Sequence, residues 1–186
     1  MANISITEVL LTCHAQSLAS GVEGISVTIT RGTSGDVTLT YRVFGETGAL
    51  EIPARSTPHR IDGLWKKTCF ELFIGNFEDE NYLEYNFSPS RQWAAYQFSG
   101  YRSDMVELET KAPNIGVAQA ADALTLTATI ALPDAWRERS LRVGINTVIA
   151  TKSGDISYWA VAHPAGKPDF HHKDCFAVQL EARSAA

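Results

Sequence analysis

Residues 25–43 read ISVTITRGTSGDVTLTYRV, and this stretch decides the fold. Apolar residues recur at every second position on both sides of a Gly-Thr-Ser-Gly cluster at 32–35. Such alternation is typical of strands with one buried and one wet face, and threonine and β-branched side chains favour it. The glycine-rich cluster is a turn signal. The stretch therefore predicts two half-buried strands separated by a turn.

The same period of two recurs along the rest of the chain. Further strand-like runs occupy 7–13, 69–75, 81–88, 92–99, 124–130, 141–150, 155–162 and 174–181. About ten strands at near-regular spacing predict an all-β fold, an antiparallel sandwich of the immunoglobulin-like or jelly-roll-like kind. Pro133 and Asp134 open a short run that predicts one short helix at an end of the sheets. A length of 186 residues suits a single domain over 1–186.

Composition excludes several classes of partner. Sixteen basic and 21 acidic residues give a net charge of −5. Binding to nucleic acid or to an anionic membrane surface needs basic surface, so neither partner is expected. No stretch approaches the roughly 20 apolar residues of a membrane-spanning helix.

The start of the chain and the cysteines both favour a cytoplasmic location. No Lys or Arg precedes Arg31, and no unbroken apolar segment resembles a secretory signal. Cys13, Cys69 and Cys175 are odd in number, far apart and without Cys-x-x-Cys spacing, so free thiols are expected rather than disulfides or a zinc site.

Residues 69–88 read CFELFIGNFEDENYLEYNFS and differ from the other runs. Glu71 shares a strand face with Cys69 and Phe73, while Glu84 and Asn86 share the corresponding face of the next strand. Acids, amides and aromatic rings suit a polyhydroxylated ligand, although ordinary cross-strand pairs on a wet sheet would look the same. The short acidic link at 76–80 predicts that the two strands form a hairpin.

The run DGLWKKTCFELFIG at 62–75 carries a resemblance to a known family. It resembles the Asp-x-x-Trp-x-x-Asp-x-x-Glu core, followed by three hydrophobic residues, of family 9 carbohydrate-binding modules in the DOMON-like superfamily. Thr68 stands where that family has its second Asp. The run YLEYNFSPSRQWAAYQF at 82–98 resembles the next strand pair of the family, and KDCFAVQL at 173–180 its closing strand.

What the resemblance implies is a β-sandwich that binds a sugar or a haem through one face and its rim loops. Family 9 modules clamp a glycan between two loop tryptophans, which makes Trp65 the first candidate and Trp159 the second, with Trp93 as the rival of Trp159. Glu71 and Asn86 are the implied hydrogen-bonding residues.

Residues 163–174, HPAGKPDFHHKD, form a loop rich in histidine. His163 and His171 are candidate ligand contacts on the rim. A metal site, or a loop without a special role, would also fit this composition. Adjacent side chains of an extended chain point in opposite directions, so His171 and His172 would need a bend to share one ion. The alternative of haem would use Met105 and His163.

We therefore predict non-catalytic binding of a small polar ligand, most plainly a saccharide, with no cofactor and no metal. The alternatives are a carbohydrate-processing enzyme using Glu71 and a haem-binding DOMON-type domain. The sequence has no Gly-x-Ser-x-Gly elbow and no P-loop, and it leaves the oligomeric state open.

Overall fold

The computed structural model describes residues 5–182 and is entirely β, with no α-helix among them. Its twelve strands are β1 (Ser5–Cys13), β2 (Val22–Arg31), β3 (Asp36–Gly45), β4 (Cys69–Gly75), β5 (Tyr82–Phe87), β6 (Trp93–Phe98), β7 (Val106–Glu107), β8 (Asn114–Gln119), β9 (Ala123–Ala131), β10 (Leu141–Ala150), β11 (Ile156–Ala160) and β12 (Val178–Leu180). Four 3₁₀ turns are η1 (Thr47–Ala49), η2 (Leu64–Lys66), η3 (Asp134–Trp136) and η4 (Lys173–Cys175).

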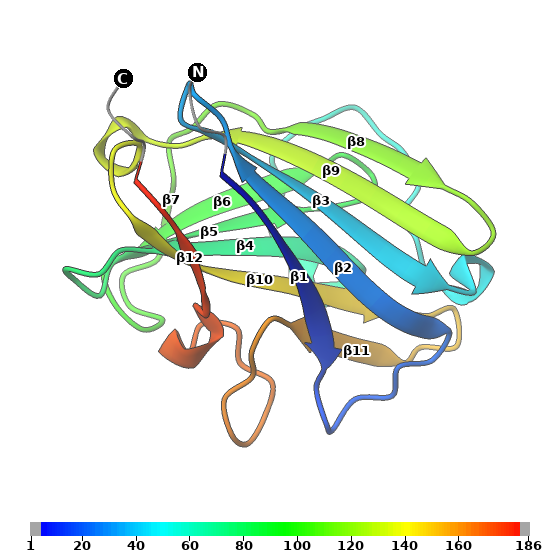
Figure 1. The fold of residues 1–186 in the computed structure, drawn as a ribbon. Coiled ribbons are helices and arrows are strands. Elements are labelled where there is room, and N and C mark those ends of the chain that lie inside the picture. Colours follow the sequence, from blue (N-terminus) through cyan, green and yellow to red (C-terminus); the bar gives the residue numbers. More distant parts are fainter. Residues whose placement is uncertain (1–4, 183–186) are drawn as a thin grey trace.

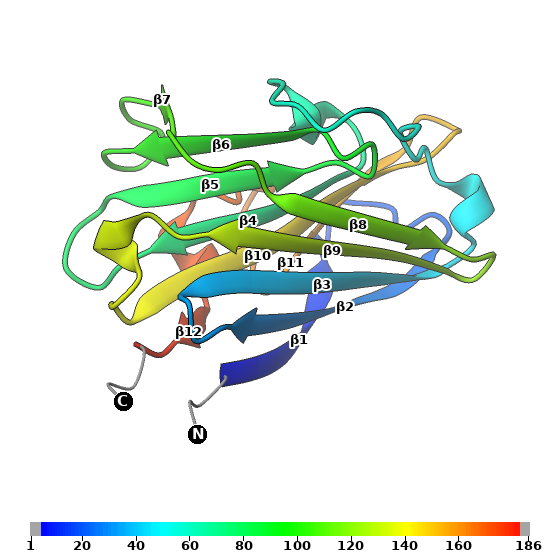
Figure 2. The same ribbon diagram turned by 90° about the horizontal axis from the view of Figure 1, so that it is seen from above.

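All pairings between these strands are antiparallel and join them in one curled sheet of order β7-β6-β5-β4-β10-β11-β1-β2-β3-β9-β8, with β12 beside β10. The sheet folds over itself into two layers (Figures 1 and 2). The first layer holds β1, β2, β3, β9 and β8, and the second holds the rest. Strand β1 joins them, because residues 5–11 pair with β2 whereas Thr12 and Cys13 pair with β11.

The main core lies between the two layers and follows from the alternation. Val27 and Leu39 of the first layer and Leu72 and Tyr85 of the second are completely buried in it. Tyr41 reaches across and donates its hydroxyl to the backbone carbonyl of Glu71 at 2.8 Å. Burying apolar side chains on both inner faces at roughly 25 cal/mol per Å² is the main stabilising contribution.

A buried arginine closes one end of the sandwich. Arg31 at the end of β2 is 3% exposed. Its guanidinium donates to the carbonyls of Trp136, Arg137, Arg139 and Glu181 at 2.6–3.1 Å. These bonds tie η3 and the segment after β12 to the first layer.

The predicted architecture is confirmed, and the hairpin of residues 69–88 is confirmed in register, from Phe70 opposite Phe87 to Gly75 opposite Tyr82. Strands β7 and β8 were not predicted from the pattern, because β7 has two residues and Ile115 is the one buried residue of β8. The predicted short helix is the 3₁₀ turn η3.

None of the helical turns formed by residues 5–182 has the length and apolar character needed to cross a bilayer. Cys13, Cys69 and Cys175 are free thiols.

Candidate functional site

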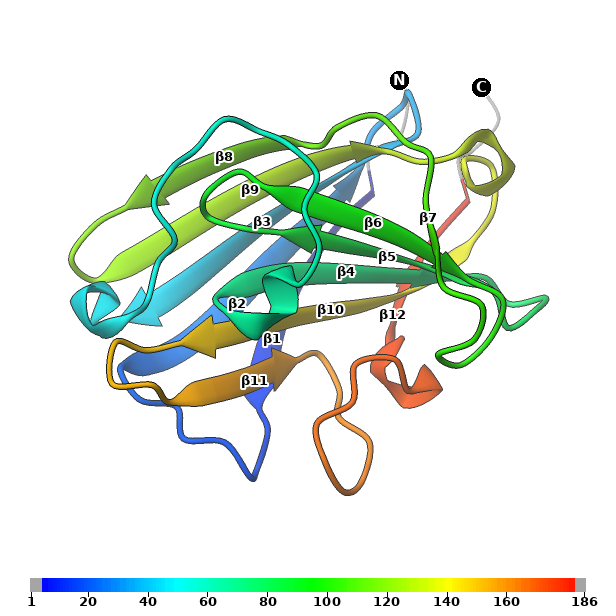
Figure 3. The ribbon, with the colours of Figure 1, turned by 180° about the vertical axis from the view of Figure 1, so that it is seen from behind.

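The outward face of the second layer is as buried as its inward face. Every residue of β4 and β5 is buried, although alternation alone would leave half of them wet. The outward side chains form a second apolar cluster that contains Cys69, Phe73, Tyr82, Ala94, Tyr96, Phe98, Val148, Ala160 and Phe170. This face is covered by η2, by the loop 99–105 and by the loop 161–177 (Figure 3). A covered sheet face of this kind can enclose a pocket.

Two rows of cross-strand neighbours form the floor. The first row runs Ala94, Asn86, Glu71, Asn146 and Ala160, on β6, β5, β4, β10 and β11 respectively. Its three polar residues are therefore flanked by alanines. The second row contains Tyr96, Glu84, Phe73 and Gly144. Glu71 and Glu84 are thus diagonal neighbours on adjacent strands, the arrangement that lets two side chains interact.

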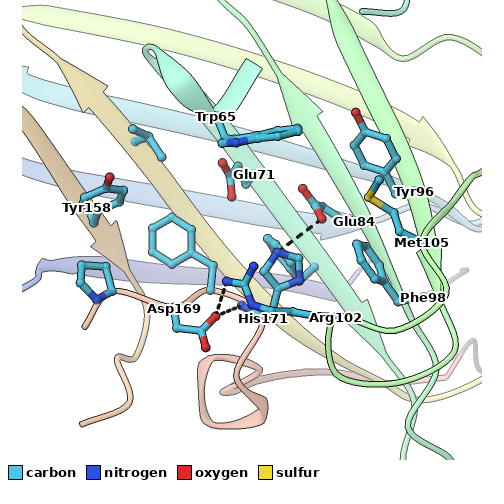
Figure 4. A pocket seen from close by; sticks show the side chains of 14 residues that line it. Trp65, Glu71, Glu84, Tyr96, Phe98, Arg102, Met105, Tyr158, Asp169 and His171 are labelled. Carbon is cyan, nitrogen blue, oxygen red and sulfur yellow. Dashed lines mark hydrogen bonds and ion pairs between the residues drawn. The ribbon is translucent and has the colours of Figure 1, made fainter. Parts of the chain in front are cut away.

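The pocket over this floor has a volume of about 480 Å³, within the usual range for small-molecule sites. Its lining comprises Trp65, Glu71, Phe73, Glu84, Tyr96, Phe98, Arg102, Met105, Val148, Tyr158, Pro168, Asp169, Phe170 and His171. Figure 4 shows the two glutamates between Trp65 and His171, with Tyr96 and Phe98 to one side.

Glu71 and Asn146 carry buried polar atoms without a partner. Oε1 of Glu71 and both Oδ1 and Nδ2 of Asn146 make no hydrogen bond to the part of the protein that the structure describes. Glu71 is 3% exposed and Asn146 is completely buried. An unpartnered buried group costs about 1–3 kcal/mol, so such groups usually bond to a water or a ligand. Glu71 lines the pocket and offers an unpartnered acid to a molecule there, whereas Asn146 lies beside it on β10 and is not part of the lining.

Glu84 is held by its neighbours. Asn86 donates its side-chain amide to Oε1 of Glu84 at 2.6 Å, and Nε2 of His171 lies 3.8 Å from Oε2. Burial raises the pKa of Glu84 to about 7. The hydrogen bond from Asn86 and the charge of Arg102 act in the opposite direction but are weaker. Burial, and then the charge of Glu84, raise the pKa of Glu71 well above its usual value. The pair therefore carries less than two negative charges near neutral pH.

His171 is a neutral group that links the floor to the rim. Tyr82 and His171 share a hydrogen bond of 2.8 Å between Oη and Nδ1, and the ring packs on Phe73 and Phe98. Burial, and then the charge of Arg102, lower the pKa of His171 to about 4. At neutral pH the imidazole therefore brings no positive charge to Glu84.

The two rim loops are bonded to each other. Arg102 and Asp169 form an ion pair at 2.8 Å, and Tyr101 donates its hydroxyl to the same carboxylate. Arg102 has a left-handed backbone with φ 52°, unusual for a residue other than glycine. Gly144 allows the loop 161–177 to lie close to the floor. A Cβ at this position would lie only 3.0 Å from the carbonyl oxygen of Cys175.

Aromatic rings form the walls. Trp65 is 42% exposed and meets Tyr96 edge to face, with ring centroids 6.4 Å apart. The Tyr96 hydroxyl donates to Asp62 at 2.5 Å, which fixes that ring. Phe98 and Tyr158 complete opposite parts of the lining. Such rings can stack on the C–H face of a sugar or contact a cation.

Of the seven residues predicted from the sequence, Trp65, Glu71 and His171 line the pocket. Asn86 lies opposite Glu71 in register but is completely buried, where it supports Glu84. Sequence reasoning treated Glu84 only as a neighbour of Glu71, and the structure shows that it is part of the lining.

Three predicted residues are not brought to the pocket. Trp93 and Trp159 are buried in the core between the layers, because both fall on the inward phase of their strands. Trp159 is therefore a residue of β11 rather than of a rim loop. His163 bonds through Nε2 to the carbonyl of Thr12 at 2.8 Å and is not part of the lining, so the Met105–His163 pair considered for haem is not assembled there.

Other lining residues were missed. Arg102 and Phe170 reach the pocket only because loops fold over the sheet, whereas Tyr158 is a residue of β11. Asn146, which lies beside Glu71 but is not part of the lining, gave one signal as a lone amide inside the run 141–150. Among the residues described, no three His, Cys, Asp or Glu side chains gather as a metal-ligand set.

The fold has a counterpart among solved structures. It matches a "putative carbohydrate-binding protein" from Bacteroides uniformis ATCC 8492 with a TM-score of 0.62, over 93% of this chain and 84% of that chain. The two sequences are 12% identical, so the likeness concerns the fold alone. No family model and no curated protein matches the sequence. The chain therefore shares its architecture with that protein, while the chemistry of the pocket is inferred from this chain's own residues.

Proposed function

We propose that this protein binds a saccharide, without catalysis, in the pocket on the outward face of its second layer. The observation that supports this most directly is the unpartnered acid of Glu71 in a pocket walled by aromatic rings, with the unpartnered amide of Asn146 beside it on the next strand. Saccharides offer hydroxyls that both donate and accept, together with C–H faces for rings. The resemblance to DOMON-like sugar-binding sandwiches and the shared fold point to the same class of ligand.

Charge in the pocket favours a polar ligand over an apolar one. Glu71 and Glu84 form adjacent parts of the floor, and the pocket also opens to Arg102 and Asp169. An apolar molecule there would leave the buried atoms of Glu71 and Asn146 unpartnered, whereas a polyol replaces the missing hydrogen bonds.

The test is a screen of mono- and disaccharides by saturation-transfer NMR, followed by calorimetric titration of the hits. We expect Trp65→Ala and Glu71→Gln each to weaken binding about tenfold or more, since a hydrogen bond to a charged group contributes about 1.5–3 kcal/mol and a ring face a comparable amount. Phe77→Ala and Glu8→Gln are matched controls, because Phe77 is 54% exposed outside this pocket and Glu8 lies on β1. If neither Trp65→Ala nor Glu71→Gln changes the saccharide affinity, the proposal is refuted.

A carbohydrate-processing enzyme is the second candidate, and the pairing of Glu71 with Glu84 favours it. Glycosidases use two carboxyl groups, one of them with a raised pKa as general acid. Glu84, with a pKa of about 7, fits that role. Release of chromophore from aryl glycosides, abolished by Glu71→Gln and by Glu84→Gln, would select the enzyme over the binding module.

A further inference from the structure

We propose that the saccharide is an amino sugar, whose ammonium group sits between the carboxyl groups of Glu71 and Glu84 under the aromatic wall. This inference rests on the proposed function and specifies the ligand of the same pocket. It follows from the distribution of charge in the molecule.

Several exposed acids of this protein have cationic partners, whereas the two buried acids of the pocket have no Lys or Arg partner among the described residues. Lys67 bonds Glu51 and Arg139 bonds Glu78, each at 2.8 Å, with every side chain at least 44% exposed. Within residues 5–182, no Lys or Arg nitrogen lies within 4.0 Å of the carboxylate of Glu71 or Glu84. Buried charges in proteins are paired, so two buried acids without a cation leave a position for one.

The neighbouring positive groups do not fill that position. Arg102 is paired with Asp169 at 2.8 Å, and both belong to the rim. His171 lies 3.8 Å from Glu84 but is neutral at pH 7, because its pKa is lowered to about 4. The lining thus contains three acids and one arginine, and the arginine pairs with the acid that is not on the floor.

The walls around the two carboxyl groups suit a cation. Trp65 and Tyr96 meet edge to face over them, and Phe73 and Phe98 lie on the same face of the sheet (Figure 4). The face of an aromatic ring attracts an ammonium group, more strongly when both are out of water. A neutral sugar can bind through the aromatic rings and a single carboxyl group. A second carboxyl group, which opposes ionisation of the first, would not increase its affinity.

The unpartnered polar atoms give a second, independent indication of a ligand. Oε1 of Glu71 and the amide of Asn146 are buried beside each other without partners. An ammonium group has three donors and no acceptor. It can therefore bond to the carboxyl oxygens of Glu71 and Glu84, which both line the pocket and act as acceptors.

The experiment is a calorimetric titration at pH 7 with three matched sets of monosaccharides. Glucosamine, galactosamine and mannosamine are compared with their N-acetyl derivatives and with glucose, galactose and mannose. We expect at least one free amine to bind at least tenfold more tightly than both of its neutral counterparts. Glu84→Gln should reduce that preference about tenfold or more, while Glu8→Gln retains it.

Proton release provides a second readout. A cation beside Glu71 and Glu84 lowers their pKa values, so binding at pH 7 should release protons, measured as different enthalpies in two buffers of unlike ionisation heat. The other titratable or charged groups near this pair are Tyr41, Cys69, Tyr82, Tyr96, Arg102, Asp169 and His171. The thiol and the three phenols stay neutral and His171 stays uncharged at this pH, so they contribute little to the exchange.

The possible failures are distinguishable. Equal affinity for amine, acetamide and hydroxyl forms would overturn this inference and leave saccharide binding intact. Absence of binding by every sugar of the panel, and by the wider screen, would overturn the proposed function as well. If 2-aminoethanol binds as tightly as the amino sugars, the site recognises an amine alone and the assignment of an amino sugar is wrong.

Discussion

Glu71 and Asn146 face each other across β4 and β10, yet neither the Oε1 atom of the acid nor the amide of Asn146 has a hydrogen-bond partner within residues 5–182. Both residues are at the middle of the sheet, where unpartnered polar atoms reduce stability. Unpartnered polar residues of this kind are expected beside a binding site rather than in a core, because functional residues often reduce the stability of the fold.

Replacing Asn146 with leucine should therefore separate stability from binding. Asn146→Leu removes two buried polar atoms and keeps a similar volume, so we expect the free energy of unfolding to stay equal or to rise by about 1 kcal/mol. Saccharide affinity should fall about tenfold. Chemical denaturation and calorimetry measure the two quantities, and a clear loss of stability would show that the amide serves the fold.

Stability should decrease as the pH rises from about 4.5 towards 7. The pKa of Glu84 is about 7 in the folded protein, against 4.5 for an unfolded glutamate, so the folded state binds more protons than the unfolded state across this window. The contribution is fully present below 4.5 and is lost as the pH passes the folded pKa. It amounts to about 3 kcal/mol at most, by 1.36 kcal/mol per unit.

Urea denaturation between pH 4.5 and 8 checks this dependence. Glu84→Gln should flatten the profile in this window, whereas Glu8→Gln should leave it unchanged. Glu71, whose pKa is also raised by burial and by the charge of Glu84, contributes to the decline in the same direction. A wild-type protein that gains stability over the same range would contradict these assignments.

Arg102→Ala should loosen the rim without unfolding the sandwich. The ion pair with Asp169 is half exposed on the arginine side, and such pairs contribute about 0.2–1 kcal/mol to stability. The melting temperature should therefore change by a few degrees at most. Hydrogen exchange should increase in the loops 99–105 and 161–177 alone, and uniform exchange across the sheets would argue against a local role.

Arg31→Met should destabilise the whole molecule. The buried guanidinium bonds four carbonyl groups, and truncation leaves them without partners, at a cost of about 3 kcal/mol or more. The melting temperature should fall by about 6 °C or more, while saccharide affinity at a temperature where the variant is folded stays unchanged. Scanning calorimetry and titration together test both statements.

Thiol titration tests the redox state. Three thiols should react after denaturation, and Cys69 and Cys175 should be slow in the native protein because both are completely buried. Cys13, half-buried, should react first. A single reactive thiol after denaturation would indicate a disulfide.

The fold was predictable because alternation of apolar residues is a local signal. The runs 25–30 and 37–43 determine which side chains face the core, and the same rule put Glu71 on the outward face of β4. Trp159 was placed on a rim loop by the family resemblance, although it falls in the strand-like run 155–162. In the structure it lies on β11 opposite Thr147 and is buried in the core between the layers. The pairing register of β10 and β11 depends on contacts that the local sequence around Trp159 does not encode.

The rest of the site depends on distant segments meeting. Arg102 and Asp169 are 67 residues apart and form the rim only after the loops fold over the sheet. Burial of both faces of β4 and β5 obscures the usual contrast between wet and dry positions. Glu84 was visible as an acid on the correct face, but the sequence could not show that none of the described Lys or Arg side chains would pair with it.

Strand β1 has a consequence for how the chain folds as it is made. Its last residues, Thr12 and Cys13, pair with Trp159 and Ala160, which leave the ribosome almost 150 residues later. Until then both the end of β1 and one edge of β4, which needs β10, are open. Open strand edges are templates for pairing with other chains, so an interrupted synthesis product that ends before residue 141 should aggregate rather than fold. The ligand pocket, whose floor needs Asn146, is therefore among the last parts of the molecule to exist.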